Sequence, residues 1–238
     1  MVPSRVLSMN QDAEIAGKYW IKNFLLLGSK IMDFVFPNTC AMCGKVIGFK
    51  ELLCTDCNEK IFNNFPIMGI DKKTKHLDKI WAFARYDDIK ELIIKYKFTP
   101  RIRLSKILSD ALYRVYHLSP ILSSFRYITF VPSTKSSKSQ RGFDHVEKLV
   151  KYFSRISNTK ILKFLKAVNK KPQIELDKKD RNLNVVGKYQ IVRVDMIPEK
   201  LILIDDIMTT GSTMEECAKV LKSIGVKEIH GLVIAYNF

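Results

Sequence analysis

The sequence has no hydrophobic run long enough to cross a membrane. The longest purely apolar run near the N-terminus covers only residues 24–27, far short of the roughly 20 residues that a transmembrane helix needs. A secretory signal peptide is not expected either, because Asp12 and Glu14 stand where a positively charged segment belongs and no small-residue cleavage site follows. We therefore expect a cytoplasmic protein without a transmembrane segment, and a poorly ordered tail over residues 1–17.

Acidic residues are scarce relative to basic ones. The 238 residues include 24 Asp and Glu against 40 Lys and Arg, which gives a formal net charge of +16, and the positive excess lies within residues 58–200. This field favours nucleic acid, anionic membrane or phosphorylated ligands, although a well-solvated lysine-rich surface accounts for it equally well. With only 10 Gly, 8 Pro and 47% hydrophobic residues, the chain has the composition of a folded protein with a sizeable core.

Two common nucleotide-binding signatures are missing, the GxxxxGK[ST] of P-loop NTPases and the GxGxxG of dinucleotide-binding folds. The chain has instead the stretch LILIDDIMTTGST at residues 201–213. Its apolar half, residues 201–204, predicts a buried strand, and the helix expected from residue 213 presents unpaired backbone N–H groups at its positive dipole end. The small and hydroxylated residues before this helix predict a phosphate-binding turn, in which Gly211 lets the backbone close around an anion.

The two acids in this stretch need a different explanation, because carboxylates repel phosphate. Asp205 and Asp206 are suited to the vicinal hydroxyls of a sugar, or to a Mg²⁺ ion bound to them. The predicted ligand thus carries a phosphate at one end and a diol at the other, as ribose 5-phosphate does. The alternative is a strand-end turn with an ordinary helix N-cap, but paired acids and five small or hydroxylated residues exceed what capping requires.

Four of the five cysteines form a CxxC…CxxC pair, namely Cys40 with Cys43 and Cys54 with Cys57. Each CxxC turn can aim two thiolates at one ion, so the pair predicts a structural Zn²⁺ site with four cysteine ligands and no open position for catalysis. Gly44 supports this prediction, because such turns often need a positive φ. Two disulfides are the alternative, which a reducing cytosol disfavours.

The rest of the chain predicts an α/β fold with a parallel sheet flanked by helices, because strand and helix patterns alternate along it. A helix over residues 20–34 should pack on the cysteine module, and residues 58–79 read as a polar connector. Strands are expected over residues 80–86, 127–131, 161–168, 201–204 and 229–236. Helices are expected over residues 89–96, 104–116, 143–153 and 213–224. Cys217 lies on the apolar face of the last helix and is expected to be a buried thiol. Ligands of such sheets bind beyond the carboxyl ends of the strands, so residues 132–135 and 205–213 should converge.

These features together resemble a known family. LILIDDIMTTGST is similar to the phosphoribosyl pyrophosphate (PRPP) binding motif of type I phosphoribosyltransferases. The four-cysteine segment, VPSTKSSKSQRGFDHVEKL and KPQIELDKKDRNLNVVGKY, in this order, resemble the competence protein F family from about residue 31 to the C-terminus. The chain departs from the family pattern at Asp144-His145, where Asn-Gln is usual, and at Thr134, where a second proline is common.

The resemblance implies an architecture. A zinc-finger module would cover residues 18–60, and a type I phosphoribosyltransferase-like domain residues 61–238. A mobile loop at about 169–190, with Gln173, Arg181 and Asn182, would close over the site.

The resemblance also implies roles for individual residues. Asp205 and Asp206 would hold the ribose hydroxyls and Mg²⁺, residues 209–213 the 5′-phosphate, and residues 133–135 the pyrophosphate. In a transferase, Lys135 and Arg181 would join the two acids as catalytic residues by stabilising the departing pyrophosphate. The full expected PRPP-binding set is Asp205, Asp206, Thr209, Thr210, Gly211, Ser212, Thr213, Ser133, Thr134 and Lys135. No general base is identified; His145 is the nearest candidate, although a lone histidine near a helix start is more often structural.

Two functions follow as hypotheses. The resemblance implies a PRPP-binding competence protein that acts in natural transformation on the cytoplasmic side, with single-stranded DNA and other DNA-uptake proteins as partners. The basic residues Lys135, Lys138 and Arg141 would then contact nucleic-acid phosphates. The alternative is an active phosphoribosyltransferase that transfers the phosphoribosyl group from PRPP to an unknown acceptor.

Overall fold

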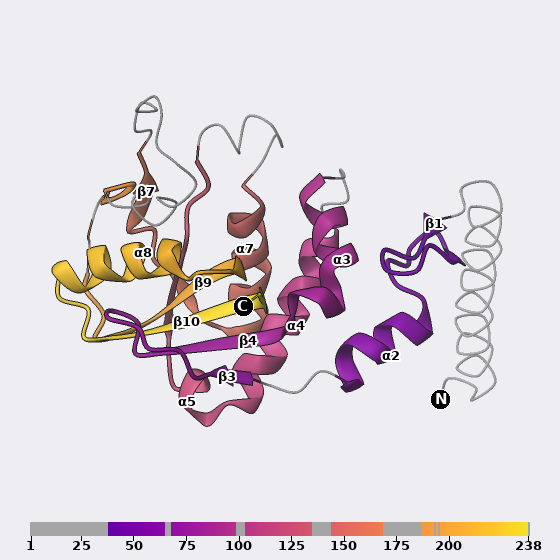
Figure 1. The fold of residues 1–238 in the computed structure, drawn as a ribbon, viewed down its shortest axis with the longest axis horizontal. Helices are drawn as coiled ribbons and strands as arrows, with labels where there is room; N and C mark the ends of the chain where they lie inside the picture. Colours follow the sequence, from indigo (N-terminus) through magenta and orange to yellow (C-terminus); the bar gives the residue numbers. More distant parts are fainter. Residues whose placement is uncertain are drawn as a thin grey trace, which may run out of the picture. The chain divides into compact units, whose positions relative to one another are not determined.

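The chain divides into two compact units, Met1–Asn58 and Glu59–Phe238, in this computed structural model (Figure 1). None of the described helices is long and apolar enough to span a bilayer. The tail expected over residues 1–17 and the helix expected over 20–34 lie outside the described residues. The structure describes residues 38–64, 68–98, 103–134, 144–168, 187–192, 194 and 196–237.

The described part of the small unit is a short cysteine-rich hairpin followed by the first residues of a helix, and the rest of this helix, from Glu59, belongs to the large unit. Strand β1 (Asn38–Thr39) pairs antiparallel with β2 (Val46–Ile47), and α2 (Thr55–Asn64) begins directly after the third cysteine. Gly44 has a φ of 78°, a left-handed conformation that costs glycine no steric energy. The positive φ predicted for the turn after the first cysteine pair is therefore confirmed.

The large unit is built on a mostly parallel sheet. Among the described residues this sheet has six strands in the order β3-β4-β10-β9-β5-β6, and only the β3–β4 pair is antiparallel. Two further short strands, β7 and β8, form a separate antiparallel pair. The strand bounds are β3 Met68–Ile70, β4 Lys79–Arg85, β5 Tyr127–Phe130, β6 Lys160–Ile161, β7 Leu165–Ala167, β8 Tyr189–Ile191, β9 Lys200–Met208 and β10 Glu228–Tyr236.

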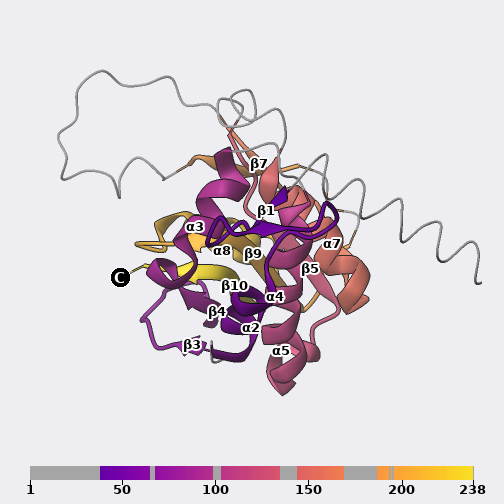
Figure 2. The ribbon, with the colours of Figure 1, turned by 90° about the vertical axis from the view of Figure 1, so that its right-hand side faces the viewer.

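Helices cover both faces of this sheet. On one face α8 (Ser212–Ser223) packs on β9, while α3 (Tyr86–Phe98), α4 (Leu104–Leu118) and α7 (His145–Ser157) contact the sheet strands from the opposite side. Helices α4 and α7 lie against each other, and the short α5 (Pro120–Ser123) follows α4 (Figure 1, Figure 2). The parallel α/β fold with flanking helices predicted from the sequence is therefore confirmed.

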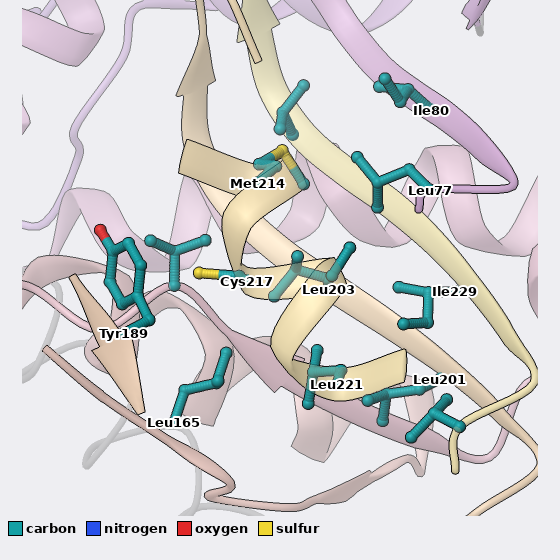
Figure 3. Close-up of a cluster of buried hydrophobic side chains, with 14 of the residues drawn as sticks. Leu77, Ile80, Leu165, Tyr189, Leu201, Leu203, Met214, Cys217, Leu221 and Ile229 are labelled. Atoms are coloured by element: carbon teal, nitrogen blue, oxygen red, sulfur yellow. The ribbon is translucent and has the colours of Figure 1, made fainter. Parts of the chain in front are cut away.

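Alternation along β9 explains how the two faces are divided. Leu201 and Leu203 belong to the apolar cluster under α8, whereas Ile202 and Ile204, which are also fully buried, point the other way because successive strand side chains alternate. Cys217 lies inside the α8 cluster beside Leu203, as Figure 3 shows. This burial confirms the prediction that Cys217 is a core thiol.

Three boundary predictions are wrong. The connector expected over 58–79 contains the end of α2 and strand β3; α2 continues because its apolar residues Ile61 and Phe62 have a core to pack on, with the Phe62 ring 6.0 Å from that of Phe83. The strand expected over 161–168 is two short strands in different sheets, β6 and β7. The strand expected to stop at Ile204 continues to Met208, because β10 pairs with it along this whole length.

The polar loop predicted over residues 169–190 lies mostly outside the described residues. Its end is not a loop, because Tyr189 begins β8 and pairs with Ala167. Burial of the Tyr189 ring in the cluster under α8 (Figure 3) explains why this short strand forms. The mobile character of the remainder stays a prediction.

Candidate functional site

The four cysteines of the small unit form a metal-binding cluster. Their sulfur atoms all lie within 4.8 Å of one another, and the Sγ atoms of Cys43 and Cys54 are 3.7 Å apart. Two sulfurs bound at about 2.3 Å to one tetrahedral ion would lie roughly 3.8 Å apart. The all-sulfur donor set and this spacing fit a structural Zn²⁺ with four ligands, as predicted.

The thiols of this cluster differ in acidity. Burial opposes ionisation of Cys40, but hydrogen bonds from the backbone at Cys43, Cys54 and Met42 outweigh it and lower the pKa of Cys40 to about 6. Burial, together with hydrogen bonds to the other thiols, raises the pKa of Cys57 to about 12. The cluster therefore holds a stabilised thiolate at Cys40 and gives up protons when a metal ion binds, because the metal ligand is the thiolate.

The acid pair lies near the C-terminal end of β9 in the large unit. Asp205 and Asp206 are both buried, although carboxylates are almost never buried without partners. Because side chains alternate along a strand, Asp205 lies on the α8 side and Asp206 on the side of α3 and α7. Two adjacent acids thus reach the same end of the sheet from opposite faces.

Asp206 is held by two cationic or protonatable groups. Its Oδ2 atom lies 2.6 Å from Nζ of Lys97, at the end of α3, and 2.7 Å from Nε2 of His145, at the start of α7. Burial by itself raises the pKa of Asp206, but the hydrogen bond with His145 and the charge of Lys97 outweigh it, and the pKa lies well below the usual range. Asp206 is therefore an ionised carboxylate.

Asp205 has the opposite character. Burial, and then the negative charge of Asp206, raise its pKa well above the usual range, even though its Oδ1 accepts a 2.8 Å hydrogen bond from the backbone N–H of Asp206. A pair with one ionised and one protonation-prone carboxyl is an arrangement that a divalent cation would stabilise, because the cation favours the charged form of both. These donors fit Mg²⁺, which prefers carboxylate oxygens and retains waters for other ligands.

The predicted phosphate turn follows β9 directly. Thr209 and Thr210 are exposed, and Gly211 adopts a φ of 79° immediately before α8 begins at Ser212. A glycine cap has no side chain to occupy the helix start, and the first turn of the helix presents backbone N–H groups and a positive dipole end. The local geometry therefore suits an anion.

The pyrophosphate loop expected after β5 lies next to the acid pair. Ser133 is held by Asp144, which accepts hydrogen bonds from the Ser133 backbone N–H at 3.2 Å and hydroxyl at 3.0 Å. Asp144 also caps α7, because its side chain accepts from the backbone N–H of Glu147. The aspartate at this departure from the family pattern thus ties the loop to the start of the helix that carries His145.

One cavity of about 190 Å³ joins these elements. Residues 132–134 line it together with Asp205, Asp206 and Thr213, so the convergence predicted for 132–135 and 205–213 is confirmed for these residues. Lys135, Lys138, Arg141 and Arg181 lie outside the described residues, so their assignments stay predictions. The cavity is lined by Lys97, Val131, Pro132, Ser133, Thr134, His145, Val146, Tyr189, Asp205, Asp206 and Thr213.

Lys97 is the first functional residue that the sequence reasoning missed. It lies one residue beyond the helix predicted over 89–96 and within the last turn of α3, where a lysine is an ordinary partner of the helix dipole. The structure instead directs it to the acid pair. His145, for which the sequence left open a structural role or a role as general base, lies in the cavity wall and pairs with Asp206.

A lysine-rich loop at residues 71–76 is the second feature that was missed. The Glu215 carboxylate in the first turn of α8 accepts hydrogen bonds from the backbone N–H groups of Lys75, His76 and Leu77. This contact holds the loop over the phosphate turn, where Nζ of Lys72 donates to the Thr210 carbonyl at 2.8 Å. A second hollow of about 470 Å³ lies between the loop and the turn, and the lysines of the loop line its side opposite the turn.

Two family models each match a part of this chain. The family model "Phosphoribosyl transferase domain" matches residues 174–237, which include the acid pair and the phosphate turn, and "Double zinc ribbon domain" matches residues 31–67, which include the four cysteines. Both matches agree with the geometry described above.

Over most of its length the chain is similar to two competence proteins. It is 27% identical over 224 residues to competence protein ComFC of Streptococcus pneumoniae, which covers 80% of this chain and 96% of the relative. It is 27% identical over 218 residues to competence protein F of Haemophilus influenzae, with coverage of 87% and 88%. The resemblance to the competence protein F family seen in the sequence is thereby confirmed.

Among solved structures, glutamine PRPP amidotransferase from B. subtilis aligns with a TM-score of 0.40 and 15% identity over 59% of this chain and 30% of that chain. A hypoxanthine phosphoribosyltransferase from Staphylococcus aureus aligns with a TM-score of 0.32 over 57% of this chain and 62% of that one.

Proposed function

We propose that the large unit binds PRPP together with Mg²⁺ in the cavity at the end of β9. The observation that carries the proposal is that two sequence-distant segments meet at one cavity: the stretch 205–213, through the acid pair and Thr213 at the start of α8, and the Ser133-Thr134 loop. Each element matches one part of the ligand, because carboxylates suit a metal-bound diol and a helix start suits a phosphate.

Within this proposal each residue has a chemical role. Asp205 and Asp206 bind the ribose hydroxyls and hold Mg²⁺, which shields the negative charge of the pyrophosphate. Residues 209–213 hold the 5′-phosphate, and Lys72 adds positive charge to the edge of the same turn. Ser133 and Thr134, with Lys135, hold the pyrophosphate.

Calorimetric titration with PRPP in the presence of Mg²⁺ tests this assignment. We expect binding by the wild-type protein and a loss of at least tenfold in affinity for Asp206→Asn, since it removes the ionised carboxylate of the pair. Lys166→Gln is the control, because Lys166 is an exposed residue of β7 and lies outside the cavity lining. Equal affinity for Asp206→Asn and wild type, or no binding of PRPP to either, would refute the assignment.

We further propose that the protein acts in DNA uptake during natural transformation and binds single-stranded DNA. Support comes from the two relatives, whose names identify them as competence proteins, and from the net charge of +16. Binding dominated by phosphate contacts weakens steeply as salt rises. Fluorescence anisotropy with a labelled oligonucleotide at 50 and 200 mM salt checks this, and an affinity that does not change with salt would contradict it.

Phosphoribosyl transfer is the second candidate function. It is favoured by His145, which lines the cavity with its ring paired to ionised Asp206. In such a transfer the bond between the ribose carbon and pyrophosphate breaks, a bond to an acceptor amine forms, and the amine proton passes to a base. Release of pyrophosphate in the presence of one member of an acceptor panel would establish it. PRPP binding without release across the whole panel would leave the protein as a binding module.

A further inference from the structure

Lys97 and His145 contact the same carboxylate oxygen, but they are held very differently. His145 is fixed from several sides: its carbonyl accepts a 2.6 Å hydrogen bond from the Tyr96 hydroxyl, and its ring meets the Tyr96 ring edge-on at a centroid distance of 6.0 Å. Its side chain is 7% exposed. Lys97 lies in the last turn of α3, and its side chain is 18% exposed and faces the cavity.

Electrostatic repulsion opposes the simultaneous binding of Lys97 and a divalent cation to Asp206. An ammonium group 2.6 Å from Oδ2 and a metal ion on the same carboxylate would repel each other strongly at this depth, where the effective dielectric constant is low. His145 is the better fixed of the two partners, so Lys97 is the group that has to move. A lysine suits this movement, since it carries a compact charge and three donors on a flexible stem.

We propose that Lys97 is a mobile counter-cation of the site: it pairs with Asp206 when no divalent cation holds that carboxylate, and with phosphate oxygens of the ligand when one does. This inference rests on the proposed binding of PRPP. The exchange keeps the charge balanced, because the cation replaces Lys97 at the acid pair while Lys97 meets the negative charge that arrives with the ligand. Lys97 thereby links cation binding to phosphate binding.

The exchange predicts effects of opposite sign in one variant. Lys97→Gln keeps a hydrogen-bond donor near Asp206 but removes the charge. We expect Mn²⁺ alone, measured by electron paramagnetic resonance on zinc-loaded protein, to bind at least tenfold more tightly. In the same variant PRPP at saturating Mg²⁺ should bind at least tenfold more weakly.

Two matched variants complete the experiment. Lys97→Arg keeps the positive charge and should stay close to wild type in both titrations. Lys90→Gln removes a charge from an exposed position of the same helix and should change neither. A merely structural ion pair predicts a different pattern, because its loss would leave Asp206 without Lys97 and change both affinities in the same direction.

The possible failures are distinguishable. If wild-type protein does not bind PRPP, the proposed function is wrong. If wild type binds PRPP but Lys97→Gln leaves the Mn²⁺ affinity unchanged, or shifts both affinities in one direction, the exchange is wrong while the proposed function stands. Should Lys97→Gln fail to fold, wild-type protein with ¹³Cε-labelled lysine provides the test: the Lys97 resonance must shift when Mg²⁺ and PRPP are added together, and an unchanged resonance overturns the exchange.

Discussion

Replacement of Gly211 by alanine isolates the contribution of the phosphate turn. Gly211 has a φ of 79° and forms the cap of α8. A Cβ at this position would lie 3.5 Å from Sδ of Met208 and 3.8 Å from Nζ of Lys72, which are ordinary van der Waals distances. The cost is therefore backbone strain without a clash.

The magnitude follows from the conformation. A residue with a Cβ pays about 1–2 kcal/mol to adopt the left-handed region. If the turn keeps its shape, this cost appears as lower stability; if the turn relaxes, it appears as weaker binding of PRPP, by roughly fivefold to thirtyfold. Urea denaturation and a PRPP titration on the same protein separate the two cases.

Gly225→Ala supplies the control at the other end of α8. Gly225 has a φ of 106°, and a Cβ there would meet Ile197 at an ordinary 3.8 Å, so the variant is strained without a clash and remote from the cavity lining. It should lose stability but keep its affinity for PRPP, whereas Gly211→Asn should recover part of the loss because asparagine tolerates left-handed φ. Equal effects of Gly211→Ala and Gly225→Ala on PRPP binding would refute the reasoning.

Three further predictions follow from the cited contacts. Asp206→Asn should lower the pKa of Asp205, since the charge of Asp206 is, after burial, a cause of its elevation. In the wild type, the stability that protonated Asp205 contributes is lost as pH rises through its folded-state pKa, and in the variant this loss should be complete at a lower pH. Carboxyl ¹³C NMR would measure the pKa, and unfolding at several pH values would measure the stability. Metal analysis should find Zn²⁺ in the wild type and none in Cys40→Ser, with release from the wild type as pH falls because protons compete for the thiolates; zinc retained by the variant would contradict the site. Leu221 is fully buried in the cluster under α8, so Leu221→Ala should lower the free energy of unfolding, measured by urea denaturation, by about 2–5 kcal/mol. A smaller loss would mean that neighbouring side chains fill the void left by the leucine.

Short-range patterns made much of this protein predictable. The two CxxC turns fix four sulfurs by local geometry, so their closeness in the structure follows from spacing within residues 40–57. The stretch 201–213 likewise carries its own strand, acids, turn and helix start. Where a function depends on neighbours in sequence, the backbone itself brings the residues together.

The errors occurred where a segment's partner decides its structure. The end of β9 has the pattern of a loop because aspartates are poor strand formers, yet pairing with β10 extends the strand through both aspartates to Met208. Strand β3 looks like part of a polar connector until it pairs with β4. Such pairings join distant residues, and no local pattern announces them.

The sequence alone was enough to predict the ligand chemistry, because the acid pair, the glycine turn and the hydroxylated residues are contiguous. Tertiary structure alone decided the electrostatics of the site. Lys97 and His145 come from two different helices, and only the packing of α3 and α7 on the sheet brings both to one oxygen of Asp206. Lys72 reaches the turn only because Glu215 anchors its loop. These charges act over a few ångströms, whereas the residues that carry them are separated by tens of positions along the chain.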